Sequence, residues 1–82
     1  LYLADTFNNK IKRVDPIRRQ VITIAGTGEQ GDTDGDALDA EFREPSGVAL
    51  HALTLYIADT HNHRIRTLDL DQMRVQHWTL DA

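Results

Sequence analysis

Three aspartates, Asp32, Asp34 and Asp36, alternate along the chain in a spacing that could bring carboxylate oxygens to one cation. They match the first, third and fifth positions of a calcium-binding loop, whose ligands are hard oxygens. The later positions do not fit, because Ala37 stands where such a loop requires glycine and Arg43 where it requires a bidentate glutamate. A calcium site is therefore the minor hypothesis. The main interpretation is a solvated acidic loop that caps a helical turn.

Glycines 26, 28 and 31 reproduce the G-x-G-x-x-G spacing of dinucleotide-binding loops. That chemistry needs a helix to begin directly after the loop, so that its N-terminus can hold the pyrophosphate. The residues that follow here, 32–36, carry three carboxylates and do not favour a bound anion. The segment is interpreted as a turn between structural units, and no cofactor is expected.

The histidines do not form a recognisable catalytic or metal-binding set. His61 and His63 could share a zinc ion only if a third ligand came from elsewhere, and His51 and His77 are isolated. The chain has no cysteine, which excludes thiolate ligands and disulfides, and no serine has the neighbourhood of a catalytic nucleophile. We therefore predict no catalytic residue and no metal ligand.

The charge balance argues against a nucleic-acid partner. Basic residues gather in the first part of the chain and recur in part later, at Lys10, Lys12, Arg13, Arg18, Arg19, Arg64 and Arg66. The whole chain nevertheless has nine Lys and Arg against thirteen Asp and Glu, a net charge of −4, whereas RNA binding needs a net positive footprint. These residues are interpreted as solvated strand and turn charges. Apolar runs are too short for a transmembrane helix, so no membrane contact is expected.

The elements that must position these residues come from an internal repeat. The stretch from Leu1 to Asp15 recurs from Leu55 to Asp69, 54 residues later. Such self-similarity at a fixed offset indicates one supersecondary unit that is stacked on copies of itself. Nine positions are identical at this offset: Leu1/Leu55, Tyr2/Tyr56, Ala4/Ala58, Asp5/Asp59, Thr6/Thr60, Asn8/Asn62, Ile11/Ile65, Asp15/Asp69 and Val21/Val75.

Alternating and β-branched residues separated by turn formers predict short strands in both copies. The expected strands are 1–4, 10–14 and 21–24 in the first copy, and 46–50, 55–59, 64–68 and 75–80 in the second. Residues 25–44 are rich in Gly, Asp, Glu and Thr and are predicted to be irregular, with one helical turn over 37–42 capped by Asp34 or Asp36 and ended by Pro45. Four short antiparallel strands per unit are typical of a β-propeller blade, with a solenoid as the alternative.

We therefore predict an all-β fold of four-stranded antiparallel blades, about one and three-quarter blades in total. Residues 1–24 form a partial blade of three strands, 25–44 an inter-blade insertion loop and 45–82 a complete blade. Repeat units are stabilised by their neighbours. Further blades of a longer chain, or self-association, are therefore expected to cover the exposed sheet faces.

Two stretches carry a family resemblance. P-S-G-V-A at 45–49 and L-Y-I-A-D-T-H-N-H-R-I at 55–65 resemble the NHL repeat, whose hallmark is P-x-G-[VL]-A followed by [LV]-Y-[VI]-A-D-[TS]-x-N-[HN]-[RK]-[IV]. The A-G-T-G start of the insertion, its acidic stretch and the following F-x-x-P-x-G resemble the NHL propellers attached to thioredoxin-like domains. The 54-residue offset is longer than the family's usual spacing, and the insertion accounts for the excess.

The resemblance implies a non-catalytic scaffold that binds a protein or a small ligand. Two alternatives stay open: a propeller within an enzyme, either beside a thioredoxin-like redox domain or as a metal-dependent lyase, and an RNA-binding NHL propeller. Asp5, Asn8, Asp59 and Asn62 are expected to be structural, with side chains that bond backbone amides across their hairpin turns. Strand reversal should gather both hairpins and the insertion on one side, and we expect the partner there, at Phe7, His61, Asp32, Asp34, Asp36 and Asp39.

Overall fold

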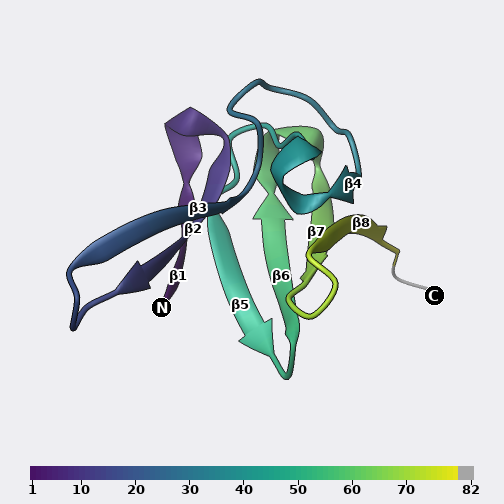
Figure 1. Cartoon of the computed structure of the whole chain (residues 1–82). Coiled ribbons are helices and arrows are strands. Elements are labelled where there is room, and N and C mark those ends of the chain that lie inside the picture. Colours follow the sequence, from purple (N-terminus) through teal and green to yellow (C-terminus); the bar gives the residue numbers. More distant parts are fainter. Residues whose placement is uncertain (80–82) are drawn as a thin grey trace.

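The computed structural model describes residues 1–79 of the chain and consists of two antiparallel sheets, without an α-helix in that range (Figure 1). The first sheet has the order β1-β2-β3 and the second the order β4-β8-β7-β6-β5. The prediction of an all-β fragment of propeller blades is confirmed. The strands are β1 (Tyr2–Asp5), β2 (Lys10–Asp15), β3 (Gln20–Ala25), β4 (Gly35–Asp36), β5 (Gly47–His51), β6 (Thr54–Asp59), β7 (Arg64–Asp69) and β8 (Arg74–Trp78).

Strands β5 to β8 form a meander in which each strand pairs with the next, as in one propeller blade. The strand expected over 46–50 begins one residue later, and the last strand begins one residue earlier than expected and ends at Trp78. Leu80, where the prediction ended, lies outside the described residues.

Each repeat copy has a short 3₁₀ turn between its first two strands, η1 (Thr6–Asn8) and η3 (Thr60–Asn62). Asn9 and His63 follow these turns in the left-handed conformation, with φ of 58° and 57°. Asparagine and histidine are among the non-glycine residues that adopt this conformation most often. The equal geometry shows that the two copies use one hairpin design.

The insertion is more ordered than the composition predicted. Its strand β4 pairs with the outer strand β8, and Gln30 forms a parallel bridge with Phe42. The helical turn is the 3₁₀ element η2 (Ala37–Asp39), shorter than the predicted 37–42. Neither predicted cap applies, because Asp36 makes no capping hydrogen bond and Asp34 bonds elsewhere. The chain becomes extended at Ala40, which lets Phe42 reach the core.

The core lies between the two sheets and includes the insertion. Its buried apolar residues come from β2, β3, the insertion and β6 to β8: Ile11, Ala25, Ala37, Ala40, Phe42, Leu55, Ile57, Leu68 and Val75. Phe42 is completely buried, so the insertion contributes its largest apolar residue to the contact between sheets. Residues 26–44 therefore pack as a part of the fold rather than as a free loop.

Candidate functional site

The most densely bonded side chain in the structure is that of Arg66 on β7, which is 0% exposed. Its guanidinium meets the carboxylates of Asp59 at 2.7 Å and Asp34 at 2.9 Å. It also donates to the backbone carbonyl oxygens of Thr33 and Glu41, each at 2.8 Å. Arginine suits such a place because its planar group offers five N–H donors in a fixed arrangement. The expectation that Arg66 is a solvated strand charge is therefore wrong.

Strand geometry explains why this charge is buried. Side chains alternate along β7, so Arg66 shares the face of Leu68, which is fully buried. The guanidinium carbon lies 4.9 Å from the centroid of the Phe42 ring, a cation–π arrangement. Every buried side-chain nitrogen and oxygen among residues 1–79 has a hydrogen-bond partner. The desolvation of the charge is thus offset by a complete set of bonds.

Asp59 and Asn62 bond each other instead of the hairpin amides. The Asn62 amide donates to Asp59 Oδ2 at 2.8 Å, and neither 3₁₀ turn has a side-chain cap bond to its backbone. Their backbone partners lie in the insertion: Asp59 accepts the N–H of Arg43 at 2.9 Å, and Asn62 donates to the carbonyl of Gly31 at 2.7 Å. The expected bonding partners were wrong, because these side chains face the incoming insertion.

The first copy repeats this arrangement at lower burial. Asn8 donates to Asp5 at 3.0 Å, and the ammonium of Lys12 lies 2.6 Å from the same carboxylate. Lys12 stands 54 positions before Arg66, so Asp5, Asn8 and Lys12 correspond to Asp59, Asn62 and Arg66. The hydrogen bond from Lys12, with that from Asn8, lowers the pKa of Asp5.

The acidic residues of the insertion pair with basic residues of the second sheet. Asp32 binds Arg64 at 2.9 Å and the His77 ring at 2.8 Å, and Asp36 binds Arg74 at 2.8 Å. Burial opposes the ionised form of Asp32, but the hydrogen bond and charge of His77, with the charges of Arg64 and Arg66, outweigh it and lower its pKa.

The oxygens that were weighed as calcium ligands therefore bind cationic side chains. Within residues 1–79 no three His, Asp or Glu side chains converge as a metal site would require. The glycine-rich stretch 26–31 contains Gln30, which forms the bridge with Phe42, and is followed by strand β4. No helix begins directly after it.

The hairpins η1 and η3 and the insertion 26–44 form one surface, which we call the loop face, at the top of Figure 1. Asn9, only 5% exposed, donates to the carbonyl of Gly28 at 3.1 Å and accepts the N–H of Glu44 at 2.8 Å. On the η3 side, the backbone N–H of His61 donates to the backbone carbonyl oxygen of Arg43 at 3.2 Å. These bonds connect both hairpins to the insertion.

The residues predicted to contact a partner differ in exposure and in whether they already form ion pairs. Phe7 is 85% exposed at the tip of η1, and Asp39 is exposed on η2. The His61 ring lies 2.6 Å from the carboxylate of Glu44. Asp32, Asp34 and Asp36 are engaged with Arg64, Arg66, His77 and Arg74 as described above.

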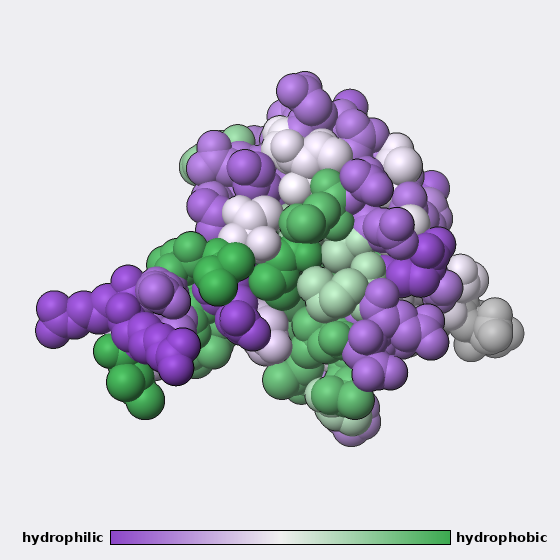
Figure 2. Space-filling view, in the orientation of Figure 1, coloured by the Kyte–Doolittle hydropathy of each residue, from purple (hydrophilic) through white to green (hydrophobic). Residues whose placement is uncertain are grey.

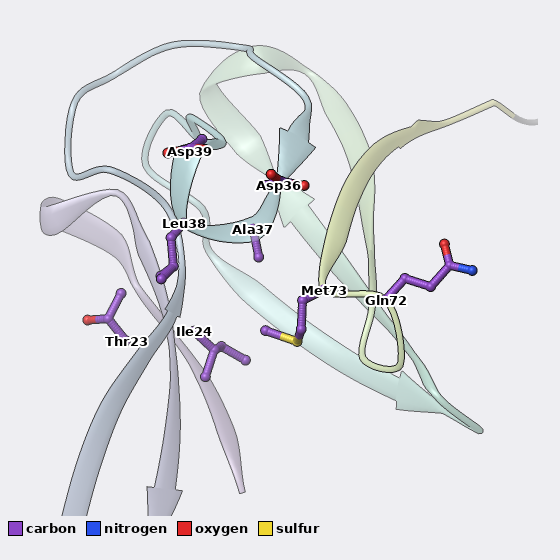
Figure 3. Close-up of a pocket in the computed structure, with 8 residues that line it drawn as sticks. All are labelled: Thr23, Ile24, Asp36, Ala37, Leu38, Asp39, Gln72 and Met73. Carbon is purple, nitrogen blue, oxygen red and sulfur yellow. The ribbon is translucent and has the colours of Figure 1, made fainter.

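A cleft of about 600 Å³ lies where η2 approaches β3 and the β7–β8 turn. Figure 3 shows Leu38 and Met73 pointing into the gap between these segments, whereas Gln72 points away. Asp36 and Asp39 are also among the residues that line it. In the orientation of Figure 1, Figure 2 shows a band of apolar surface across the middle of the molecule, between more hydrophilic regions.

Sequence reasoning missed Arg66 and Asn9 as organising residues. One signal was available, since both repeat copies place a basic residue seven positions after the aspartate, at Lys12 and Arg66. The contacts themselves join positions up to 35 residues apart, as between Asn9 and Glu44. No local pattern shows such partners.

The four-stranded meander β5 to β8 and the three-stranded sheet β1 to β3 beside it define one complete and one partial blade of a β-propeller. Residues 42–68 match the family described as NHL repeat, so this part of the chain is an NHL repeat. The chain is 44% identical over 73 residues to "Protein SUPPRESSOR OF QUENCHING 1, chloroplastic" of Arabidopsis thaliana. It is 44% identical over 78 residues to "NHL repeat-containing protein 2" of Bos taurus, and 41% identical over 78 residues to the Homo sapiens protein of that name.

These matches cover 88% of this chain for the plant protein and 92% for each of the two animal proteins. The chain spans only 7% of the plant protein and 11% of the animal proteins. It therefore corresponds to a small part of each relative.

No helix among residues 1–79 is long and apolar enough to cross a membrane.

Proposed function

We propose that this segment is a non-catalytic propeller module whose loop face binds a protein or a small ligand. The observation that carries the proposal is the bonding of the insertion to both hairpins, through Asn9 and Asn62. Recognition usually resides in loops that a rigid scaffold holds in place. A surface fixed in this way loses little conformational entropy when a partner binds.

A non-catalytic role is supported by the state of the ionisable groups. The buried charges of Arg66 and Asp59 bind each other and the backbone, and the ring of His77 lies between two carboxylates. Groups engaged in this way hold the insertion in place. The module then acts through its exposed side chains, of which Phe7, Leu38 and Asp39 are the candidates for contact.

The test compares exposed residues at the two ends of the module. Phe7, 85% exposed, lies on the loop face, and Ile17, 91% exposed, lies in the β2–β3 turn at the opposite end. Binding partners captured by the wild-type chain are quantified by mass spectrometry and compared with those of Phe7→Ala, Asp39→Asn and Ile17→Ala. We expect the first two variants to lose the same partner at unchanged melting temperature and the third to keep it. Retention by Phe7→Ala and Asp39→Asn would contradict the proposal.

A further inference from the structure

Equivalent residues of the two repeat copies differ sharply in burial. Six residues of the second sheet that face the first are 0–1% exposed: Leu55, Ile57, Asp59, Arg66, Leu68 and Val75. The residues 54 positions earlier are Leu1, Leu3, Asp5, Lys12, Val14 and Val21, of which Leu1 is 78%, Leu3 38% and Val21 58% exposed. Ile11 on β2 is buried toward the second sheet, so its neighbour Lys12 lies on the opposite face. The outer face of the first sheet therefore carries residue types that form a buried interface in the second copy.

The second copy shows which kind of segment this set of residues binds. Asp59, Asn62 and Arg66 contact the main chain of the insertion at Arg43, Gly31, Thr33 and Glu41. Contacts to backbone groups place few demands on the side chains of the bound segment. The side-chain demands come from the guanidinium, which pairs with Asp32 and Asp34 and packs against the Phe42 ring. The bound segment is thus an acidic loop that folds back on itself, since the N–H of Glu41 donates to the carbonyl of Thr33 at 3.0 Å, and it ends in an aromatic residue.

The first copy presents the same three polar groups already in position. The bonds from Asn8 and Lys12 to Asp5, at 3.0 and 2.6 Å, match those from Asn62 and Arg66 to Asp59, at 2.8 and 2.7 Å. The side chains of Asp5 and Lys12 are 24% and 26% exposed, against 0% for both counterparts. The group is pre-organised and accessible, which reduces the entropy lost on binding.

We propose that Asp5, Asn8 and Lys12 form a docking site for an acidic inter-blade loop of another repeat unit, with the chemistry of Gly31–Phe42. Asp5 accepts a backbone N–H of that segment, Asn8 donates to a backbone carbonyl, and the ammonium of Lys12 binds two alternating aspartates. An aromatic residue then covers the stem of Lys12. Asp5 and Lys12 lie on the outer face of the first sheet, and Asn8 lies in η1 at its border with the loop face. The peptide titration tests this site without the partner of the loop face.

The experiment uses a synthetic peptide of residues 30–44, QGDTDGDALDAEFRE, titrated into the ¹⁵N-labelled chain. We expect saturable amide shift changes at Asp5, Asn8 and Lys12. Lys12→Ala should weaken the affinity about tenfold, the loss of one charge-assisted contact of about 1.4 kcal/mol. The matched control is Arg18→Ala in the β2–β3 turn, which should bind as the wild type does. A peptide with Asp32→Asn and Asp34→Asn should bind about tenfold more weakly.

Three results would overturn the proposal. The first is equal peptide affinity of the wild type and Lys12→Ala, or no binding at all. The second is a set of shift changes confined to Asp59–Arg66, which would mean that the peptide replaces the chain's own insertion. The third, measured by sedimentation, is an oligomer that forms without peptide and dissociates in Lys12→Ala, which would make a second copy of the chain the occupant.

Discussion

The guanidinium of Arg66 lies 2.7 Å from the carboxylate of Asp59, and both side chains are completely buried. The insertion closes over this pair, because Asp34 and the carbonyls of Thr33 and Glu41 bind the same guanidinium. The pair therefore joins strands β6 and β7 to a segment that the sequence alone presents as an acidic loop.

Removal of the Asp59 carboxylate should be strongly destabilising. Asp59→Ala leaves the buried charge of Arg66 without its best-placed partner, and losses for such changes are about 3–5 kcal/mol. The same substitution at Asp5, whose side chain is 24% exposed, should cost about 1 kcal/mol or less. Urea denaturation of both variants measures the free energies of unfolding. Equal losses at the two positions would mean that burial does not set the energy of the pair.

Arg66→Lys should also destabilise, although the charge is kept. A lysine ammonium has three donors and cannot reproduce the bonds to Asp59, Asp34 and two carbonyl groups. We expect a loss of about 2 kcal/mol or more from buried acceptors that remain unsatisfied. The reverse change in the first copy, Lys12→Arg, should stay within about 0.5 kcal/mol of wild type because that side chain is accessible. A wild-type melting temperature for Arg66→Lys would show that charge alone suffices.

The free energy of unfolding should decrease at acidic pH because the carboxylate of Asp32 becomes protonated. Its pKa is lowered in the folded state, since the bond and charge of His77 and the charges of Arg64 and Arg66 outweigh the effect of burial. Because the pKa of Asp32 is lower in the folded than in the unfolded chain, its ionised carboxylate stabilises the fold fully at pH values above the unfolded pKa of aspartate. This contribution to the free energy of unfolding is lost as the pH falls through the lower, folded-state pKa. Urea unfolding over a series of acidic pH values should give a flatter stability curve for Asp32→Asn than for wild type. Parallel curves would exclude this role.

Gly26 should not tolerate a side chain. Its φ is 98°, and a Cβ there would lie 2.5 Å from the backbone oxygen of Asn9. Gly26→Ala should therefore cost about 1–3 kcal/mol or more, from the left-handed conformation and the displaced hairpin. Gly47 is the matched control, because a Cβ there meets no atom within 4 Å. Gly47→Ala should melt at or slightly above the wild-type temperature, and an equal loss for both variants would contradict the steric explanation.

The repeat and its strands could be predicted because their causes are local. Alternation, β-branched residues and turn formers act over a few neighbouring residues, and the 54-residue offset showed that one unit is used twice. Apart from β4, which was not predicted, the observed strands agree with those predictions to within a residue or two at most boundaries. The NHL resemblance rested on the same short stretches, and the family match covers residues 42–68.

The roles of the charged residues were decided by the tertiary structure. Asp5 and Asp59 have the same local sequence pattern, yet one is accessible and the other buried, because only the second is covered by an insertion. Arg66 meets residues 32–34, more than thirty positions away, and its burial depends on Phe42 reaching the core. Desolvation and pairing depend on which segment packs against a side chain, and that follows from the assembled sheets rather than from neighbouring residues.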